Sequence, residues 1–319
     1  MWRKSPKLLE ELCRDAPFAP FIQLWSGKKP PLRVDWNNMR IKKIVIIGMG
    51  LIGGSIGKAL IKKNLADEVA GVCRRESSLD RAVREKSLTK GFINNYGEAV
   101  RGADIILIAT PVSTIKGILK NLSEVINDTK ILVSDAGSTK KEIVDYAARF
   151  KDKFSFIGAH PLAGSEKSGV EYSSSGLFEN SVCILTPTKD SSNENYEKVK
   201  NLWESLGAVT CRLSPEEHDN NIAFSSHLPH AAAYALMGAL PDAFPRNMIA
   251  SGFKDITRIA SSDPELWKDI FMSNKTNVVK AIRCFRNILS EFEEDIKAGR
   301  AEELKIKLQK MKEMRNNIV

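Results

Sequence analysis

The sequence is poor in cysteine and has no long hydrophobic run, and these absences exclude several classes of protein. Its five cysteines, at positions 13, 73, 183, 211 and 284, are odd in number and form no Cys-x-x-Cys pair. This pattern indicates neither a disulfide framework nor a zinc site, so we expect no metal. No apolar run approaches the roughly 18 residues of a membrane-spanning helix, and the N-terminus lacks a signal peptide's apolar block. We therefore expect a cytoplasmic protein with no membrane partner.

Aromatic residues make up only 7% of the chain, which limits how its positive charge is interpreted. Lysine and arginine exceed aspartate and glutamate by 48 to 39, and the excess is spread along the sequence. A basic balance favours anionic partners in general. A nucleic-acid surface would show a basic stripe interleaved with aromatic side chains, which this sequence lacks. A nucleotide-sensing or nucleic-acid-binding protein is therefore the weaker alternative to one that binds a small anionic molecule.

The pattern of hydrophobic residues divides the chain into an extension and two domains. Residues 1–40 are proline-rich and weakly periodic, so we interpret them as an N-terminal extension, with Met39 as an alternative start. Over residues 41–213, short β-branched runs alternate with segments of helical period, which predicts parallel βα units. The fold class is α/β, with a doubly wound, mostly parallel Rossmann-type sheet forming a dinucleotide-binding domain. The predicted strands span residues 43–48, 68–73, 103–110, 130–137, 154–160 and 181–188.

Residues 214–319 predict helices and no further strand. Two long candidates span residues 219–240 and 277–299. The first is apolar on more than one face, which is more than a small domain buries by itself. We therefore expect an all-α domain that contributes to the substrate site and packs against a second copy as a homodimer.

A glycine-rich turn indicates where a dinucleotide binds. Gly48, Gly50 and Gly53 form a Gly-x-Gly-x-x-Gly directly after a predicted strand and at the start of a helix. The glycines permit a tight turn and close approach of the pyrophosphate. The first N–H groups of the helix bind the anion, and Leu51 and Ile52, which lie between the second and third glycines, belong to this cofactor-binding turn. Thr110 and Pro111, at the end of the predicted strand 103–110, are also expected to contact the cofactor.

The residues after the second predicted strand favour NADP over NAD. An acid that binds the ribose 2′-hydroxyl is usual about 20 residues past the glycines, but Cys73 stands at that strand end here. Arg74, Arg75 and Ser77 follow, and guanidinium groups with nearby hydroxyls bind a 2′-phosphate through charge-assisted hydrogen bonds. The alternative is a solvated arginine pair at a helix start.

Catalytic candidates lie at the ends of the predicted strands 130–137 and 154–160. Ligands of doubly wound sheets bind beyond the carboxyl ends of the strands, and His160 ends the strand before "PLAGSEKSG". It is therefore placed to take a proton while a hydride leaves for nicotinamide. Ser138, which follows the preceding strand, is placed either to fix the tautomer of the ring or to hold the substrate oxygen.

The helical domain offers two further clusters. In "SSHLPH", His227 and His230 share a helix face, and Pro229 predicts a kink that presents His230 and Ser226 to a cleft. A zinc pair would need a third ligand at suitable spacing, and none follows. Asp255 and Arg258 lie one helical turn apart, either as an exposed ion pair or as a carboxylate anchor in which Asp255 orients Arg258.

Seven blocks in order resemble one family, the prephenate and arogenate (cyclohexadienyl) dehydrogenases of tyrosine biosynthesis. The resemblance covers about residues 41–295. Its blocks are "GMGLIGGS", "DAGSTK", "HPLAGSEKSG", "LF" with "ILTPT", "SPEEHD", "SHLPH" and "GFKDITRIASSDPELWKDIF".

The resemblance implies an NAD(P)-dependent oxidative decarboxylation of prephenate, of arogenate or of both. By the same resemblance, His160 deprotonates the ring hydroxyl with the support of Ser138, and Arg258 with Asp255 anchors a carboxylate. It also implies that Ser226 and His230 line the substrate pocket, that Glu166 organises it, and that Trp267 reaches toward the neighbouring subunit's cleft. An NADP-dependent 3-hydroxyacid dehydrogenase of similar architecture is the alternative, although such enzymes use a lysine where this helix has histidines.

Overall fold

The computed structural model describes residues 41–164 and 167–318, and the first domain is built on one eight-stranded sheet. The strand order is β3-β2-β1-β4-β5-β6-β7-β8, and all neighbouring pairs are parallel except β6 and β7. The strands are β1 (Ile41–Ile47), β2 (Ala66–Cys73), β3 (Lys90–Ile93), β4 (Ile105–Ile108), β5 (Leu132–Asp135), β6 (Ser155–Pro161), β7 (Val182–Thr186) and β8 (Val209–Arg212). The doubly wound, mostly parallel sheet is therefore confirmed.

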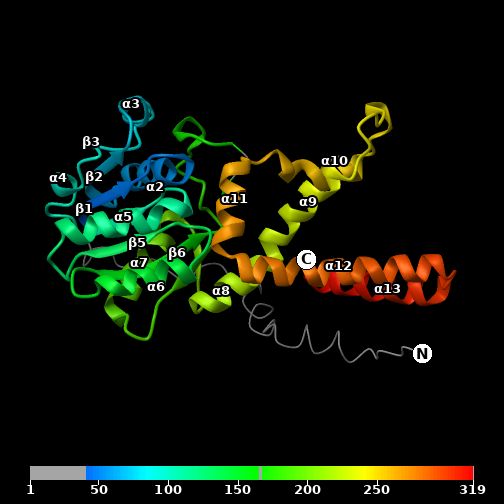
Figure 1. Cartoon of the computed structure of the whole chain (residues 1–319). Helices are drawn as coiled ribbons and strands as arrows, with labels where there is room; N and C mark the ends of the chain where they lie inside the picture. The colour runs from blue at the N-terminus through cyan, green and yellow to red at the C-terminus, as the bar shows by residue number, and fades with distance from the viewer. Residues whose placement is uncertain (1–40, 165–166, 319) are drawn as a thin grey trace.

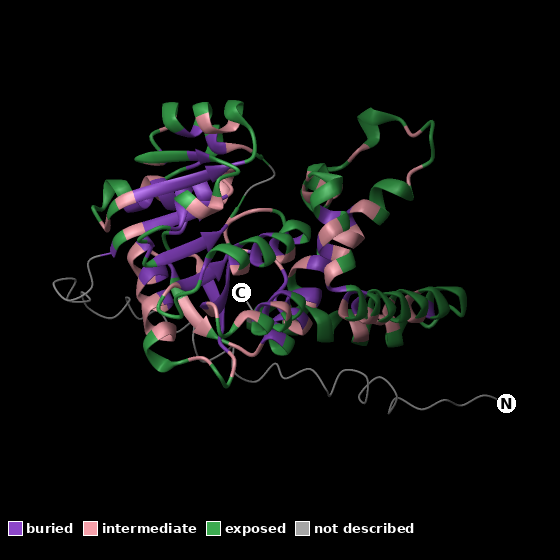
Figure 2. Ribbon diagram, turned by 60° about the vertical axis from the view of Figure 1, so that its left-hand side comes forward, coloured by how far each residue is buried: buried purple, intermediate pink, exposed green. Residues whose placement is uncertain are grey.

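Helices cover both faces of this sheet, as Figure 1 shows. They are α2 (Leu51–Lys62), α3 (Glu76–Arg84), α4 (Tyr96–Ala99), α5 (Val112–Val125), α6 (Lys141–Ala147) and α7 (Asn193–Leu206). Because side chains alternate along a strand, Ile44 and Ile46 of β1 pack under α2 and α7, whereas Val45 and Ile47 pack under α5 and α6. The central strands are apolar on both faces for this reason, and Figure 2 shows the resulting buried centre.

The rest of the described chain is helical, which confirms an all-α domain after the sheet. Its elements are α8 (Pro215–Ile222), the π-helical turn η4 (Ala223–His227), α9 (Leu228–Gly238), α10 (Ser251–Thr257), the 3₁₀ turn η6 (Arg258–Ser261), α11 (Pro264–Ser273), α12 (Lys275–Lys297) and α13 (Ala301–Ile318). Helix α8 starts at a capping box in which Ser214 accepts from the N–H of Glu217 and the Glu217 carboxylate accepts from the N–H of Ser214.

The long helix predicted over residues 219–240 is interrupted where the sequence has its proline. The chain runs from α8 through η4 into α9, and Pro229 is the second residue of α9. Proline has no N–H to donate to the preceding turn, and a wider π-helical turn is one way in which a continuous helix accommodates that loss. The turn holds Ser226 and His227, and His230 follows within the first turn of α9.

Helix α11 of the helical domain packs against the first domain. It packs on α5, so that Trp267 and Ile270 extend the hydrophobic cluster on that face of the sheet. The Ser113 hydroxyl donates to the Asp269 carboxylate, and the Thr139 hydroxyl lies 3.1 Å from that of Ser273. The helical domain is thereby held against the carboxyl ends of β4 and β5.

Candidate active site

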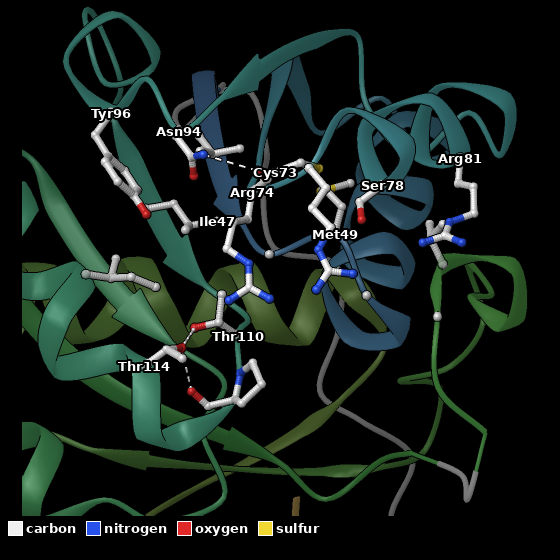
Figure 3. Close-up of a pocket in the computed structure, with 18 residues that line it drawn as sticks. Ile47, Met49, Cys73, Arg74, Ser78, Arg81, Asn94, Tyr96, Thr110 and Thr114 are labelled. Atoms are coloured by element: carbon white, nitrogen blue, oxygen red, sulfur yellow. Dashed lines mark hydrogen bonds between the residues drawn. The ribbon is translucent and has the colours of Figure 1, made fainter. Parts of the chain in front are cut away.

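A cavity of about 490 Å³ lies over the carboxyl ends of β1, β2 and β4. This is the edge at which the strand order reverses between β1 and β4, where doubly wound sheets bind ligands. Figure 3 shows side chains from β2, α3 and the start of α5 around it. Among the residues that line it are Gly48, Gly50, Cys73, Arg74, Arg75, Ser78, Arg81, Asn94, Tyr96, Thr110, Pro111 and Thr114.

The three glycines of the turn have separate physical reasons. Gly48 has a φ of +97°, and a Cβ added there would lie 2.6 Å from the Thr110 methyl group. A Cβ at Gly53 would lie 2.0 Å from the carbonyl oxygen of Gly48, so this glycine lets helix and strand pack. A Cβ at Gly50 would meet nothing within 4 Å and would enter the cavity instead. The space at Gly50, at the uncapped start of α2, fits a pyrophosphate held by main-chain N–H groups.

The side of the cavity formed by β2 and α3 carries three arginines. Arg74 and Arg75, both predicted to bind the cofactor, line it, and Arg81 joins them from nearly two turns into α3. Ser78 lines the cavity, whereas Ser77 does not. Of the predicted cofactor residues, Leu51, Ile52 and Gly53 also lie outside the lining, because they belong to the first turns of α2.

His160 lies at the end of β6 and is only 9% exposed. Its Nδ1 is 2.8 Å from Nε2 of His218, which is fully buried at the start of the helical domain. Burial lowers the pKa of both imidazoles well below the usual value, so both rings are neutral at neutral pH. The sequence left two roles open for Ser138, fixing the tautomer of the ring or holding the substrate oxygen. The partner of His160 at Nδ1 is His218, so holding the substrate oxygen is the remaining prediction for Ser138.

The support behind this histidine pair comes from two acids and one lysine. His218 Nδ1 is 2.7 Å from Asp219 Oδ1, and the Asp219 carboxylate accepts from the main-chain N–H groups of Lys140 and Lys141 at the start of α6. The buried ammonium of Lys140 pairs with Asp135 and donates to the carbonyl of Ala159 at 2.9 Å. The residue before His160 is therefore fixed to β5 and α6.

A second group of rings lies beside the first. His230 stacks on Trp267 with ring centroids 3.5 Å apart, and His227 meets the same indole edge-on at 6.1 Å. Asn274 donates to the main-chain carbonyl of Asp219 at 2.7 Å and lies 3.3 Å from Nδ1 of His227. Trp267 is 7% exposed within its own chain, where it packs on His230, and its implied reach toward a neighbouring subunit stays a prediction.

The remaining predicted residues are placed as follows. Ser226 presents its main-chain carbonyl, 3.0 Å from Nδ1 of His230, so backbone from this residue orients the ring. Asp255 on α10 and Arg258 on η6 are both exposed. Glu166 lies outside the described residues.

Sequence reasoning missed His218, Asp219, Lys140 and Asn274. His218 and Asp219 stand in the block "SPEEHD", and Lys140 in "DAGSTK", but nothing in either block shows that they meet. The hydrogen bonds that bring them together, from His218 to His160, from Lys140 to Asp219 and from Asn274 to Asp219, join positions 55 to 79 residues apart in the chain. The only available signal was the scarcity of histidine, since all four belong to this connected group.

Two sequence models of one family match the chain in register with this architecture. Residues 56–212 match the model described as "Prephenate dehydrogenase, nucleotide-binding domain", and residues 214–310 match "Prephenate dehydrogenase, dimerization domain". The chain belongs to the prephenate dehydrogenase family. The family resemblance expected from the sequence is thereby confirmed, and the 3-hydroxyacid dehydrogenase alternative is not favoured.

Individual members of the prephenate dehydrogenase family agree with this assignment. The prephenate dehydrogenase of Bacillus subtilis is 37% identical over 246 residues, a match that spans 74% of this chain and 65% of that enzyme. The Aquifex aeolicus prephenate dehydrogenase, solved with hydroxyphenyl propionate and NAD⁺, superposes with a TM-score of 0.82 at 36% identity over 88% of this chain and 100% of that one. Synechocystis arogenate dehydrogenase gives a TM-score of 0.75 at 28% identity, over 87% of this chain and 100% of that one.

Within the described residues no helix has the length and apolar character needed to cross a membrane.

Proposed function

We propose that this chain catalyses the NAD(P)-dependent oxidative decarboxylation of prephenate, of arogenate or of both, a step of tyrosine biosynthesis. The observation that carries the proposal is the position of His160, a neutral imidazole at the end of β6. In the sheet, only β5 lies between β6 and the strands β4, β1 and β2 that carry the cofactor cavity. The relatives at 28–37% identity carry the names of both activities.

In the proposed mechanism the chain positions substrate and cofactor and handles one proton. Gly48, Gly50 and the N-terminal turn of α2 hold the cofactor, and NAD(P)⁺ bound there supplies the acceptor for a hydride from the ring carbon that bears the hydroxyl. His160 accepts the hydroxyl proton as the carbonyl forms. The ring carboxylate then leaves as CO₂, its bonding electrons enter the ring, and the ring oxygen takes the proton back to give a phenol.

The substrate pocket is proposed to lie between the two domains. His230 and Trp267 form a flat wall against which a six-membered ring packs, with Ser226 fixing the imidazole through its carbonyl. Arg258, oriented by Asp255, anchors a substrate carboxylate, and Ser138 holds the hydroxyl. Guanidinium groups suit this task because two parallel N–H groups meet the two oxygens of a carboxylate.

We propose that NADP is the preferred cofactor. The end of β2 presents Cys73 where an acid would repel a 2′-phosphate, and Arg74, Arg75 and Arg81 surround the same part of the cavity with Ser78. Replacing Arg74 and Arg75 together with alanine should weaken NADP binding by about tenfold or more, as expected for the loss of charge-assisted hydrogen bonds worth about 1.5–3 kcal/mol, and should leave NAD binding unchanged. An equal loss for both cofactors would show that these arginines do not read the phosphate.

The homodimer is proposed from the exposed surface of α12 and α13, which together form a helical arm. Figure 2 shows that α12 and α13 leave much of their surface exposed. On α12 the exposed apolar residues recur at helical spacing as Ile282, Phe285, Leu289 and Ile296. Such a stripe needs an apolar partner, and a second copy of the same arm supplies one.

The test of the activity is a grid of two substrates and two cofactors. Prephenate and arogenate are each incubated with NAD and NADP, and the reduced nicotinamide is followed by its absorbance. We expect turnover in at least one combination, fastest with NADP, and no turnover after His160→Asn, although that variant should bind cofactor normally. An inactive wild-type grid would refute the proposed activity, and an active His160→Asn variant would refute the role of His160.

A further inference from the structure

Three buried side chains form a line behind the proposed base. His160 Nδ1 lies 2.8 Å from His218 Nε2, and His218 Nδ1 lies 2.7 Å from Asp219 Oδ1. His218 is fully buried and Asp219 is 3% exposed. Because these buried nitrogen and oxygen atoms are hydrogen-bonded to one another, the position of each hydrogen between them can be deduced from the donor and acceptor capacity of the three side chains.

The assignment of protons begins at the acid end. The Asp219 carboxylate accepts from the N–H of Lys140 at 2.7 Å and from the N–H of Lys141 at 3.0 Å. Burial raises the pKa of Asp219, but these two main-chain donors and the nearby Lys140 ammonium act in the opposite direction and favour the ionised carboxylate, which has no hydrogen to give. His218 must therefore donate through Nδ1–H.

The second histidine follows from the first. A neutral imidazole carries a hydrogen on one nitrogen only, so His218 Nε2 has a lone pair and accepts. His160 must then donate through Nδ1–H, which leaves the lone pair on Nε2. This nitrogen is the one that remains to meet a bound substrate.

Burial, together with the surrounding charges, lowers the pKa of His218 and favours the neutral ring. Lys140 faces the pair with its ammonium bound to Asp135, and His227 faces it from η4. Burial is the largest cause that lowers the pKa of His218, and the nearby lysine acts in the same direction. The thiol of Cys183 on β7, which lies beside the His160 backbone, has its pKa raised by burial and stays uncharged. His218 therefore does not store the transferred proton.

We propose that His218 is a positioning residue: held by Asp219, it fixes His160 in the tautomer protonated on Nδ1, which is the only neutral form able to take the substrate proton on Nε2. The inference rests on the proposed role of His160 as base. It adds that the base depends on an acceptor supplied by the helical domain, so the two domains must be docked for the ring to be competent.

Two substitutions separate orientation from bulk. His218→Leu removes the acceptor, so the His160 ring loses its preference for the competent tautomer; we expect kcat to fall by about 10²- to 10⁴-fold, the scale of tautomer loss in a serine-protease triad. The KM for substrate and the Kd for cofactor should change by less than about threefold, since neither ground-state complex needs the lone pair. His218→Gln offers an amide oxygen as acceptor and should recover at least about tenfold of the lost kcat.

The tautomer is also observable in the unaltered protein. The chain has four histidines, so ¹⁵N-histidine labelling gives a spectrum that single variants assign. Above pH 7.5 we expect His160 and His218 to carry hydrogen on Nδ1, with Nε2 unprotonated. His160 protonated on Nε2 would overturn the inference, as would wild-type kcat in His218→Leu.

These outcomes are distinct from failure of the proposed function. If His160→Asn is inactive while His218→Leu is fully active, the positioning role is wrong and the base stands. If His160→Asn is active, the base itself is wrong. Should His218→Leu fail to fold, the tautomer in the wild-type spectrum decides the question alone.

Discussion

Gly50 and Gly53, three residues apart in the same turn, should respond differently to one added methyl group. At Gly53 the new Cβ would lie 2.0 Å from the Gly48 carbonyl oxygen and 3.1 Å from Ile46 Cγ2, so strand and helix must separate. Overpacking of this kind costs about 1–3 kcal/mol. At Gly50 the Cβ meets no protein atom within 4 Å, and the backbone, at φ −92°, is open to alanine.

Gly50→Ala should therefore fold with nearly wild-type stability and bind the cofactor poorly. If the methyl group displaces the pyrophosphate at the same cost of about 1–3 kcal/mol, the Kd rises about 5- to 150-fold. Gly53→Ala should lose stability first, visible as a lower midpoint of chemical unfolding.

Chemical denaturation and titration with NADP, both on the full chain, measure the two quantities. Equal cofactor affinity in Gly50→Ala and wild type would contradict the placement of the pyrophosphate. Equal stability in Gly53→Ala and wild type would contradict the packing of α2 on β1.

Three further predictions concern stability and assembly. Burial lowers the pKa of His227 from 6.5 to about 4, so below pH 6.5 the unfolded chain binds a proton that the folded chain does not. This histidine alone should lower the free energy of unfolding by about 3 kcal/mol between pH 7 and pH 4, in addition to the losses from His160 and His218, and His227→Gln should lose less than wild type over the same range. Lys140→Met leaves the buried carboxylate of Asp135 unpaired and should cost about 3–5 kcal/mol in urea unfolding, whereas adding Asp135→Leu should restore part of it. Leu289→Glu should convert the dimer to a monomer by light scattering; Asn287→Glu, on the opposite side of α12, is its control, and monomers from both variants would argue against the proposed stripe.

Much of the sheet was predictable because its strands are continuous apolar runs. The runs at 43–48 and 68–73 became β1 and β2 with small changes at their ends. Strands β3 and β8 were missed, since each has four residues, β3 ("KGFI") buries only Phe92, and β8 ("VTCR") buries none, which leaves no hydrophobic pattern to recognise. The antiparallel pairing of β7 with β6 was also not predictable, because the residues of a strand do not indicate whether it runs parallel or antiparallel to its neighbour.

The chemistry was predictable only up to single residues. His160 was found from its position at a strand end, which is a local property of the sequence. The order Asp219–His218–His160 depends on packing between α6, α8 and β6, and sequence spacing carries no information about that packing. The π-helical turn before Pro229 illustrates the same limit, since a proline predicts that a helix is disturbed but not how the disturbance is absorbed.

The most direct test of the central claim counts the two products together. With prephenate or arogenate and NAD(P), the wild-type chain should release one CO₂ for each reduced nicotinamide formed, and His160→Asn should form neither. Reduced nicotinamide without CO₂, or both products at the wild-type rate from His160→Asn, would contradict it.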